Sequence, residues 1–313
     1  MRQAEVLDVG CHSALLSVAR GRKTGGLRPV RSRKVRLALH RALAADGRLR
    51  RTGIRSVQQA VAETLAEEPR SGLEDLFPFA TSVIRDAPNR DEVIDRVAQA
   101  TGIRLRVLPG EEEARLAYVA ARSWAGDDAG PLLVLDIGGG TVEIAYGTGA
   151  SPRKVYSLPL GARQVTRELL PGGLAGSARH LAEVREELSR SLSAAGDLVP
   201  GDAPGLRVLA CSKTFTQLAR LAAVRPRPGA RQLTLPALRK TIPVLAAAGV
   251  ADRARLPGVS AHRAEQSLAG ALVAEALMEA CATDAVTICP WSTREGLLIE
   301  RLRTTAAREP HAA

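Results

Sequence analysis

Residues 132–147 constrain the fold of this chain more than any other stretch. They read Leu-Leu-Val-Leu-Asp-Ile-Gly-Gly-Gly-Thr-Val-Glu-Ile-Ala-Tyr-Gly, an apolar run, an acid, three glycines and a second run of alternating residues. The two runs have the patterns of β-strands. Gly138, Gly139 and Gly140 lack a Cβ, so their N–H groups can approach an anion closely. We therefore predict a β-hairpin whose turn binds phosphate.

Two acids flank this turn. The carboxylate of Asp136, at the end of the first strand, can hold a divalent ion. The two-residue period of a strand places Thr141 and Glu143 on one face and Val142 on the other. We expect the polar face to point towards whatever the turn binds.

The same pattern occurs once more at the start of the chain, in residues 5–19. Asp8 and Gly10 take the places of Asp136 and Gly138, 128 residues earlier. The repetition predicts a duplicated α/β domain with a ligand held in a cleft between the halves. Cys11, His12 and Ser13 follow Gly10. Cys11 is read as a small packed residue or a thiol near the ligand, and His12 as a phosphate donor or a solvent-facing side chain.

Length and cysteine content restrict the class of protein. A chain of 313 residues is long enough for two domains. Neither a signal peptide nor a membrane helix is expected, which favours a cytoplasmic protein. The four cysteines show no paired ligand spacing, so neither a disulfide framework nor a structural zinc site is expected.

The net charge of +11 raises the question of a nucleic-acid partner, and residues 20–55 are the most basic segment. Only five of the 44 basic residues are lysine, a bias that GC-rich codons produce without selection for binding. Aromatic residues make up 3%, which argues against stacking on bases. A phosphate chain is therefore a better partner for this charge than a specific nucleic acid, and a merely solvated basic face is the alternative.

Three further segments carry candidate groups. Arg85 follows a strand at residues 77–80, where parallel sheets bind ligands, although a plain helix start is the alternative. Glu113 begins a helix and shares a face with Leu116, which makes it a general-base candidate beyond any role at the helix dipole. Ser212 and Lys213 lie between a strand and a helix, an arrangement that favours an anion but does not match the Walker pattern.

Taken together, these motifs resemble the exopolyphosphatase and guanosine pentaphosphate phosphohydrolase family (Ppx/GppA). The resemblance covers nearly the whole chain and is carried by residues 7–10, 80–87, 110–116, 136–143, 157–162 and 256–260, with Arg263 and Ala264.

The resemblance implies an α/β fold of two ribonuclease H-like domains, as in the actin and sugar-kinase superfamily, flanking an interdomain cleft. The expected first domain comprises residues 1–122 and 291–313, and the second comprises residues 123–290. The chain looks like the short form of the family, without the C-terminal helical domains of longer members. Dimers occur in the family, so a homodimer is possible.

The resemblance also implies site roles. Glu113 would activate the attacking water, and Arg85 would neutralise charge on the phosphate. The remaining residues fall into two groups: Mg²⁺ (or Mn²⁺) ligands, namely Asp8, Asp136 and Glu143; and phosphate-binding residues, namely Gly10, Cys11, His12, Ser13, Gly138, Gly139, Gly140, Thr141, Ser212 and Lys213.

This sequence departs from the family pattern in two loops. Cys11 and His12 replace a Ser-Asn pair, and Ser212-Lys213 stands where many relatives have a glycine. The favoured function is exopolyphosphatase acting on short polyphosphate. The alternatives are a guanosine pentaphosphate 5′-phosphohydrolase, a sensor that binds polyphosphate or nucleotide without turnover, and a sugar-kinase-like phosphotransferase.

Overall fold

The computed structural model describes residues 3–21, 26–67, 75–126, 128–199, 204–223 and 232–308. The chain divides into two compact units. The first unit is Met1–Glu112 with Arg294–Ala313, and the second unit is Glu113–Thr293. Each unit is built on one mixed β-sheet with helices, so the α/β class predicted from the sequence is confirmed.

The first unit contains a five-stranded sheet in the order β3-β2-β1-β4-β5. The β1–β2 and β2–β3 pairs are antiparallel, and the β1–β4 and β4–β5 pairs are parallel. The strands are β1 (Gln3–Val9), β2 (Ser13–Gly21), β3 (Leu27–Arg36), β4 (Leu76–Ala80) and β5 (Arg106–Val107). The helical elements are η1 (Leu39–Ala42), α1 (Arg51–Leu65), α2 (Ser82–Arg85), α3 (Arg90–Thr101) and α11 (Thr293–Arg308).

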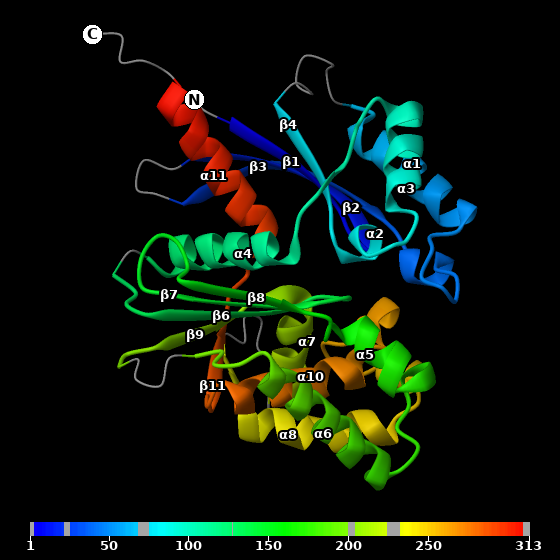
Figure 1. The fold of residues 1–313 in the computed structure, drawn as a ribbon, viewed down its shortest axis with the longest axis vertical. Helices are drawn as coiled ribbons and strands as arrows, with labels where there is room; N and C mark the ends of the chain where they lie inside the picture. The colour runs from blue at the N-terminus through cyan, green and yellow to red at the C-terminus, as the bar shows by residue number, and fades with distance from the viewer. Residues whose placement is uncertain are drawn as a thin grey trace. The chain divides into compact units, whose positions relative to one another are not determined.

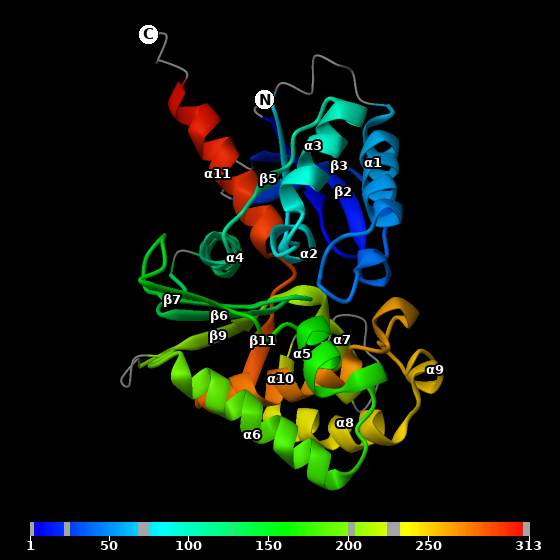
Figure 2. The same ribbon diagram turned by 45° about the vertical axis from the view of Figure 1, so that its right-hand side comes forward.

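Helices cover both faces of this sheet, with α1 and α3 on one side and α11 on the other (Figures 1 and 2). Val57 and Val61, one turn apart on α1, are fully buried against strand residues such as Leu16. On α11, Leu298 is buried, and the guanidinium carbon of Arg301 lies 5.4 Å from the centroid of the Phe77 ring. The apolar spacing of α1 thus has the packing role expected for it.

The second unit contains a six-stranded sheet in the order β10-β11-β9-β6-β7-β8. The strands are β6 (Leu132–Ile137), β7 (Val142–Gly147), β8 (Lys154–Leu158), β9 (Arg207–Ala210), β10 (Gln232–Thr234) and β11 (Ala285–Ile288). The helices are α4 (Gly110–Ala125), α5 (Ala162–Leu169), α6 (Ala178–Ala194), α7 (Ser212–Ala222), α8 (Leu235–Ala247), α9 (Val250–Arg253) and α10 (Ser267–Ala280), with 3-10 turns η3 (Pro171–Gly173) and η4 (Ala261–Arg263).

The two sheets repeat one topology. The series β8-β7-β6-β9-β11 has the same order as β3-β2-β1-β4-β5, with two antiparallel pairs followed by parallel ones. Strand β10 is an addition that pairs antiparallel with β11. The duplication predicted from the two acidic hairpins is therefore confirmed at the level of topology.

Strand β6 is buried on both faces, and its side chains alternate between two clusters. Leu132 and Val134 pack against α4, whereas Leu133, Leu135 and Ile137 face the cluster formed with the helices of the opposite side. Figure 1 shows α4 on one face of this sheet and α5, α6, α7, α8 and α10 on the other. This accounts for the continuous apolar run that precedes Asp136.

The division of the chain differs from the predicted domain boundaries at both crossings. The prediction ended the first domain at residue 122, yet the first unit ends at Glu112, at the opposite end of α4. Ala114, Ala117 and Tyr118 pack in one cluster with β6, so most of α4 groups with the second unit. The return to the first unit occurs after Thr293 rather than after residue 290.

None of the helices in the described ranges combines the length and the apolar character that a membrane crossing requires.

A buried guanidinium ties together three segments of the second unit. Arg253, at the end of α9, is 0% exposed. Its Nε donates to the carbonyl of Leu245 at 2.7 Å, and its Nη1 donates to that of Gly173 at 2.6 Å. Burial lowers the pKa of this guanidinium from its ordinary value. Arg253 thus joins α8, η3 and α9 through charge-assisted bonds.

We expect Arg253→Met to destabilise the protein by about 2–5 kcal/mol, because two buried carbonyls lose a charged donor. Arg255→Met is the matched control, since Arg255 is exposed and pairs with exposed Asp252. Urea unfolding of both variants measures the difference. Equal stability of the two variants would contradict this role.

Candidate active site

The glycine turn between β6 and β7 is held by the start of helix α5. Within the turn, the Gly138 amide donates to the Thr141 carbonyl at 2.9 Å. The carbonyls of the turn are also bonded. They accept hydrogen bonds from the first amides of α5: Gly161 to Gly140 (3.1 Å), Ala162 to Gly138 (3.0 Å), and Arg163 and Gln164 to Gly139 (2.9 and 3.1 Å).

Gly161 makes this close approach possible. A Cβ at this position would lie 2.4–2.5 Å from backbone atoms of Gly139, Gly140 and Thr141. Only glycine fits there without moving the turn. The motif at residues 157–162 is therefore the structural partner of the glycine turn, a relation that its sequence alone did not reveal.

The amides of Gly139 and Gly140 differ from the turn's carbonyls in their hydrogen bonding. Among the backbone hydrogen bonds of the described residues, none is donated by the amides of Gly139 or Gly140. Consecutive amides of this kind form a concave binding site for an anion. These two amides therefore suit the phosphate binding predicted for the turn, whereas the Gly138 amide is bonded to Thr141 and the roles of Gly138 and Thr141 remain predictions.

Two carboxylates lie directly behind the turn. Asp136 and Glu143 are opposite each other in the antiparallel ladder, so their side chains share one face. Glu143 is 5% exposed and accepts a hydrogen bond from Ser157 at 3.1 Å. Asp136 accepts one from Ser292. The structure thus brings together, at the carboxyl end of β6, the two acids of this unit that are predicted to bind metal.

Helix α7 is attached to the same strand end. The Thr214 hydroxyl donates to the carbonyl of Ile137 at 3.0 Å, immediately before the glycine turn. Ser212 has φ +80° and accepts a hydrogen bond from the Phe215 amide at 3.4 Å, whereas Lys213 is exposed. The Ser212 hydroxyl therefore serves its own helix, and Lys213 remains a predicted phosphate contact.

Glu113 lies in the first turn of α4 and is 8% exposed. Its neighbour Glu111 is exposed and Glu112 is half-buried. The Glu113 carbonyl accepts a hydrogen bond from the Thr293 hydroxyl at 3.3 Å. The inward position expected for Glu113 is what the structure shows, and its role as base remains a prediction.

The first unit has its own acidic loop. Gly10 donates its amide to the Ser13 carbonyl at 2.9 Å, and a Cβ on Gly10 would lie 3.6 Å from the Thr81 hydroxyl and 3.9 Å from Asp8. Burial raises the pKa of Asp8 to about 6, against the opposing effect of Arg294. Asp8, Gly10 and Thr81 therefore form one site at the end of β1.

Arg85 is fixed by neighbours within the same unit. Its Nε donates to Asp86 at 2.9 Å, and its Nη1 to the Leu108 carbonyl at 3.4 Å. These contacts limit the positions that the guanidinium can adopt. They do not test its predicted contact with phosphate.

The acids at the loop of each unit are of the kind that binds a hard divalent cation. Asp8, Asp136 and Glu143 offer carboxylate oxygens, which Mg²⁺ and Mn²⁺ prefer. Glu143 is buried and Asp8 is partly buried, and burial raises the pKa of Asp8 although Arg294 opposes this effect. A cation bound there would favour the ionised carboxylate.

Comparison with known proteins gives a consistent result. The model of the Ppx/GppA phosphatase family matches residues 17–305. Exopolyphosphatase 1 of Mycobacterium tuberculosis is 41% identical over 306 residues, which cover 96% of this chain and 88% of that protein. A guanosine-5′-triphosphate,3′-diphosphate pyrophosphatase of Aeromonas hydrophila is 25% identical over 301 residues, which cover 93% of this chain and 58% of that protein.

Among solved structures, a Ppx/GppA family member of Aquifex aeolicus superposes with a TM-score of 0.79 at 26% identity. The superposition covers 98% of this chain and 99% of the other. The likeness therefore extends over both units and is not limited to the loop motifs.

The raised pKa of Asp8 predicts a pH-dependent stability in the absence of metal. The folded state holds the Asp8 proton more tightly than the unfolded state, whose pKa is 3.8. The stabilising contribution is therefore complete below that pKa and is lost as the pH rises through about 6. Asp8→Asn, which stays neutral, should lose less stability over the same range.

Urea unfolding of both proteins in chelator, across this pH range, measures the difference. Mg²⁺ added at neutral pH should stabilise the wild-type protein more than Asp8→Asn. Parallel pH profiles of the two proteins in chelator would show that Asp8 does not titrate as described.

Proposed function

Since its residues 17–305 match the family model, this chain belongs to the Ppx/GppA phosphatase family, and we propose that it is an exopolyphosphatase. The substrate would be inorganic polyphosphate, from which the enzyme removes the terminal phosphate by metal-dependent hydrolysis. The relative that carries the name exopolyphosphatase 1 is 41% identical to this chain over nearly its full length.

One observation carries the proposal. The glycine turn has its carbonyls bonded to the start of α5, and the two strands that it joins carry two acids, Asp136 and Glu143, opposite each other in the ladder. Amides suit phosphate oxygens, and the acids suit the cation that accompanies them. This pairing is what hydrolysis of a phosphoanhydride requires, because phosphoryl transfer depends mainly on positioning and charge stabilisation.

Glu113 is proposed as the general base. A buried carboxylate at the start of a helix can stay ionised, because the helix dipole favours negative charge there. It would accept a proton from water while the water oxygen bonds to the terminal phosphorus. The bridging P–O bond then breaks, and the shortened chain leaves with the bridging oxygen.

Further residues would neutralise the charge of the substrate. Arg85 would pair with phosphate oxygens, and Gly10 with Ser13 would contribute a second phosphate loop. Asp8, Asp136 and Glu143 would hold Mg²⁺ or Mn²⁺, which supplies charge stabilisation when bound. Lys213, which is exposed, would extend the phosphate contacts.

The guanosine pentaphosphate activity is the second candidate. The guanosine-5′-triphosphate,3′-diphosphate pyrophosphatase of Aeromonas hydrophila is only 25% identical to this chain, so similarity supports this activity less than it supports the exopolyphosphatase activity. Aromatic residues form only 3% of the chain, which limits the groups available to stack on a guanine. A binding protein without turnover is the third candidate, but such a protein would not need Glu113 as a base.

We place the reaction in the cytoplasm. The four cysteines, all of them described, form no disulfide, and reduced thiols fit a reducing compartment. A homodimer remains a prediction from the family resemblance.

Glu113→Gln should lower kcat for polyphosphate by on the order of 10²–10⁴-fold, because the variant cannot accept the proton of the attacking water. Polyphosphate binding should persist. Glu111→Gln is the matched control, since Glu111 lies on the same helical turn but is exposed. Phosphate release from short polyphosphate and from guanosine pentaphosphate, measured side by side with Mg²⁺, tests both substrates.

Wild-type turnover by Glu113→Gln would remove Glu113 as the base. Release from guanosine pentaphosphate alone would favour the second candidate. Binding without release from either substrate, in the unaltered protein, would favour the sensor.

Asp136→Asn should raise the Mg²⁺ concentration needed for half-maximal activity by roughly 10-fold or more, because a neutral amide binds the ion less strongly than a carboxylate. A Mg²⁺ titration of the rate measures this shift. Asp197→Asn, on the same unit but remote in sequence from the glycine turn, is the control. An unchanged Mg²⁺ requirement would exclude Asp136 from the metal site.

A further inference from the structure

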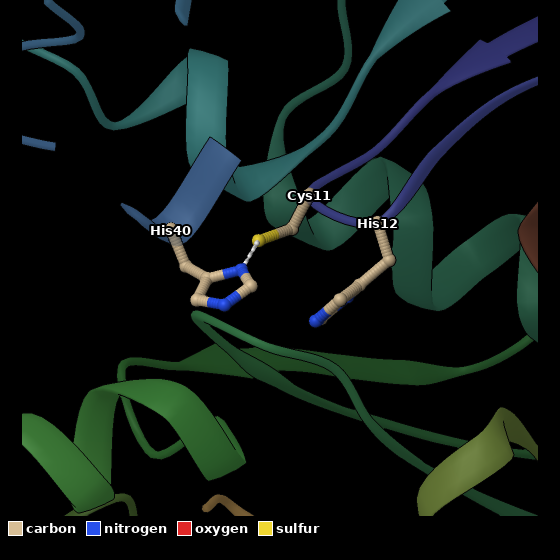
Figure 3. A group of neighbouring side chains, drawn as sticks. All are labelled: Cys11, His12 and His40. Atoms are coloured by element: carbon tan, nitrogen blue, oxygen red, sulfur yellow. Dashed lines mark hydrogen bonds between the residues drawn. The ribbon is translucent and has the colours of Figure 1, made fainter. Parts of the chain in front are cut away.

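Three soft-metal ligands converge beside the first loop of this chain. Cys11 and His12 belong to the loop between β1 and β2, and His40 belongs to η1. Their ligand atoms all lie within 4.8 Å of one another. Figure 3 shows the Cys11 sulfur directed at the His40 ring, with the His12 ring beside it. Motif spacing did not predict this cluster, because His40 lies 28 residues beyond His12.

Backbone contacts set the positions of these side chains. The Leu37 amide donates to the His12 carbonyl at 2.9 Å, and the Leu39 amide donates to the Cys11 carbonyl at 3.0 Å. Leu39 itself is buried in the core of the first unit. The segment that carries His40 is therefore fastened to the loop by main-chain bonds and core packing, so the three ligands are preorganised.

The observed spacing suits a tetrahedral ion. Sγ of Cys11 and Nδ1 of His40 are 3.7 Å apart. Zn–S and Zn–N bonds of about 2.3 and 2.05 Å at the tetrahedral angle place the two atoms about 3.6 Å apart. The His12 and His40 ring centroids are 5.2 Å apart. Cys11 and His40 thus already have the spacing of two ligands of one ion, and a shift of the His12 side chain would bring the third donor to it.

We propose that Cys11, His12 and His40 bind one borderline divalent metal of the Zn²⁺ class. One thiolate and two imidazoles are donors that Zn²⁺ prefers and Mg²⁺ avoids. His12 and His40 are half-buried and Cys11 is 9% exposed, which leaves the cluster accessible and a fourth position for water or another ligand. This site is chemically distinct from the carboxylates assigned to the Mg²⁺ site.

A plain S–H···N hydrogen bond between Cys11 and His40 is the competing interpretation. A hydrogen bond would depend on Cys11 and His40 alone, whereas a metal site also depends on His12. The effect of replacing His12 therefore separates the two interpretations. The other three thiols do not compete for the metal, since Cys211, Cys281 and Cys289 are almost fully buried. Burial raises the pKa of Cys281 to about 12, so this thiol remains protonated at neutral pH.

The test is a Co²⁺ titration of the reduced, full-length protein, without substrate and with Mg²⁺ in large excess. Excess Mg²⁺ occupies the carboxylates, and the absence of polyphosphate removes a competing chelator. Co²⁺ adopts the geometry of Zn²⁺ and absorbs in the near ultraviolet when a thiolate binds it. We expect this absorption to saturate at one equivalent and to disappear when Zn²⁺ is added.

Cys11→Ser should abolish the thiolate absorption. His12→Asn and His40→Gln should each weaken Co²⁺ binding beyond the roughly 10–100-fold that loss of an outer-shell partner causes. Cys289→Ser and His262→Gln are matched controls, the first at a buried thiol and the second at an exposed imidazole. Both controls should bind as the unaltered protein does.

Folding of the variants is not expected to confuse the result. Cys11→Ser and His12→Asn introduce the Ser-Asn pair that the family resemblance gives for this loop. Thermal unfolding in chelator checks each variant. Absence of the thiolate absorption, its survival in Cys11→Ser, or undiminished binding by His12→Asn would each overturn the proposal. Because no turnover is measured, failure here leaves the proposed hydrolase function untouched.

Discussion

The hydrogen bonds between the glycine turn and the start of α5 are the interaction on which the candidate site depends. A helix begins with amides that lack partners within the helix. Here the amides of residues 161–164 find them in the carbonyls of the turn. Each such bond contributes about 0.5–1.5 kcal/mol, but its directional effect matters more. With the carbonyls held on the α5 side, Gly139 and Gly140 can present their amides to a phosphate. Gly161 is the condition for this arrangement, because any side chain there would collide with the turn.

The first unit solves the same problem with different residues. Its loop carbonyls, at Cys11 and His12, accept hydrogen bonds from the amides of Leu39 and Leu37. In both units, the segment that follows the third strand of the meander returns to fasten the loop between the first two strands. The duplication thus extends beyond strand order to the way each loop is held. The first loop, however, carries a thiol and an imidazole where the second has glycines.

The sequence predicted those parts of the structure that are encoded locally. Both acidic hairpins, the apolar spacing of α1 and the inward position of Glu113 follow from periodicity within a few residues. The partners that arrive from distant segments carried no such signal. Ser292 reaches Asp136 across 156 residues, and Thr214 reaches Ile137 across 77. A single serine or threonine is too common for its position alone to indicate a contact.

The difference between the predicted domain boundary and the division of the chain into compact units has a similar cause. Helix α4 has apolar residues on the face that packs against β6, and its sequence does not say which sheet it will cover. Small side chains such as Ala114, Ala117 and Ala121 allow the helix to lie close to whichever strand is next to it. Tertiary packing decides which sheet α4 covers, and local sequence patterns do not encode that packing. The order of the motifs placed α4 after the first sheet, whereas the side chains group it with the second.

The chemistry of the donors separates two kinds of metal ligand within a few residues of the chain. Asp8, next to the last residue of β1, offers a hard carboxylate, and Cys11, in the following loop, offers a soft sulfur. A hard ion such as Mg²⁺ gains little from a thiolate or an imidazole, and Zn²⁺ binds both strongly. Strand β1 supplies the Asp8 carboxylate from a regular ladder. His40, by contrast, lies in η1, which follows β3 in the chain and brings its ring to Cys11. The carboxylate is thus fixed by the part of the fold that both units repeat. The Cys-His cluster depends on residues that only the first unit contains, which is why it can bind a different ion without altering the duplicated framework.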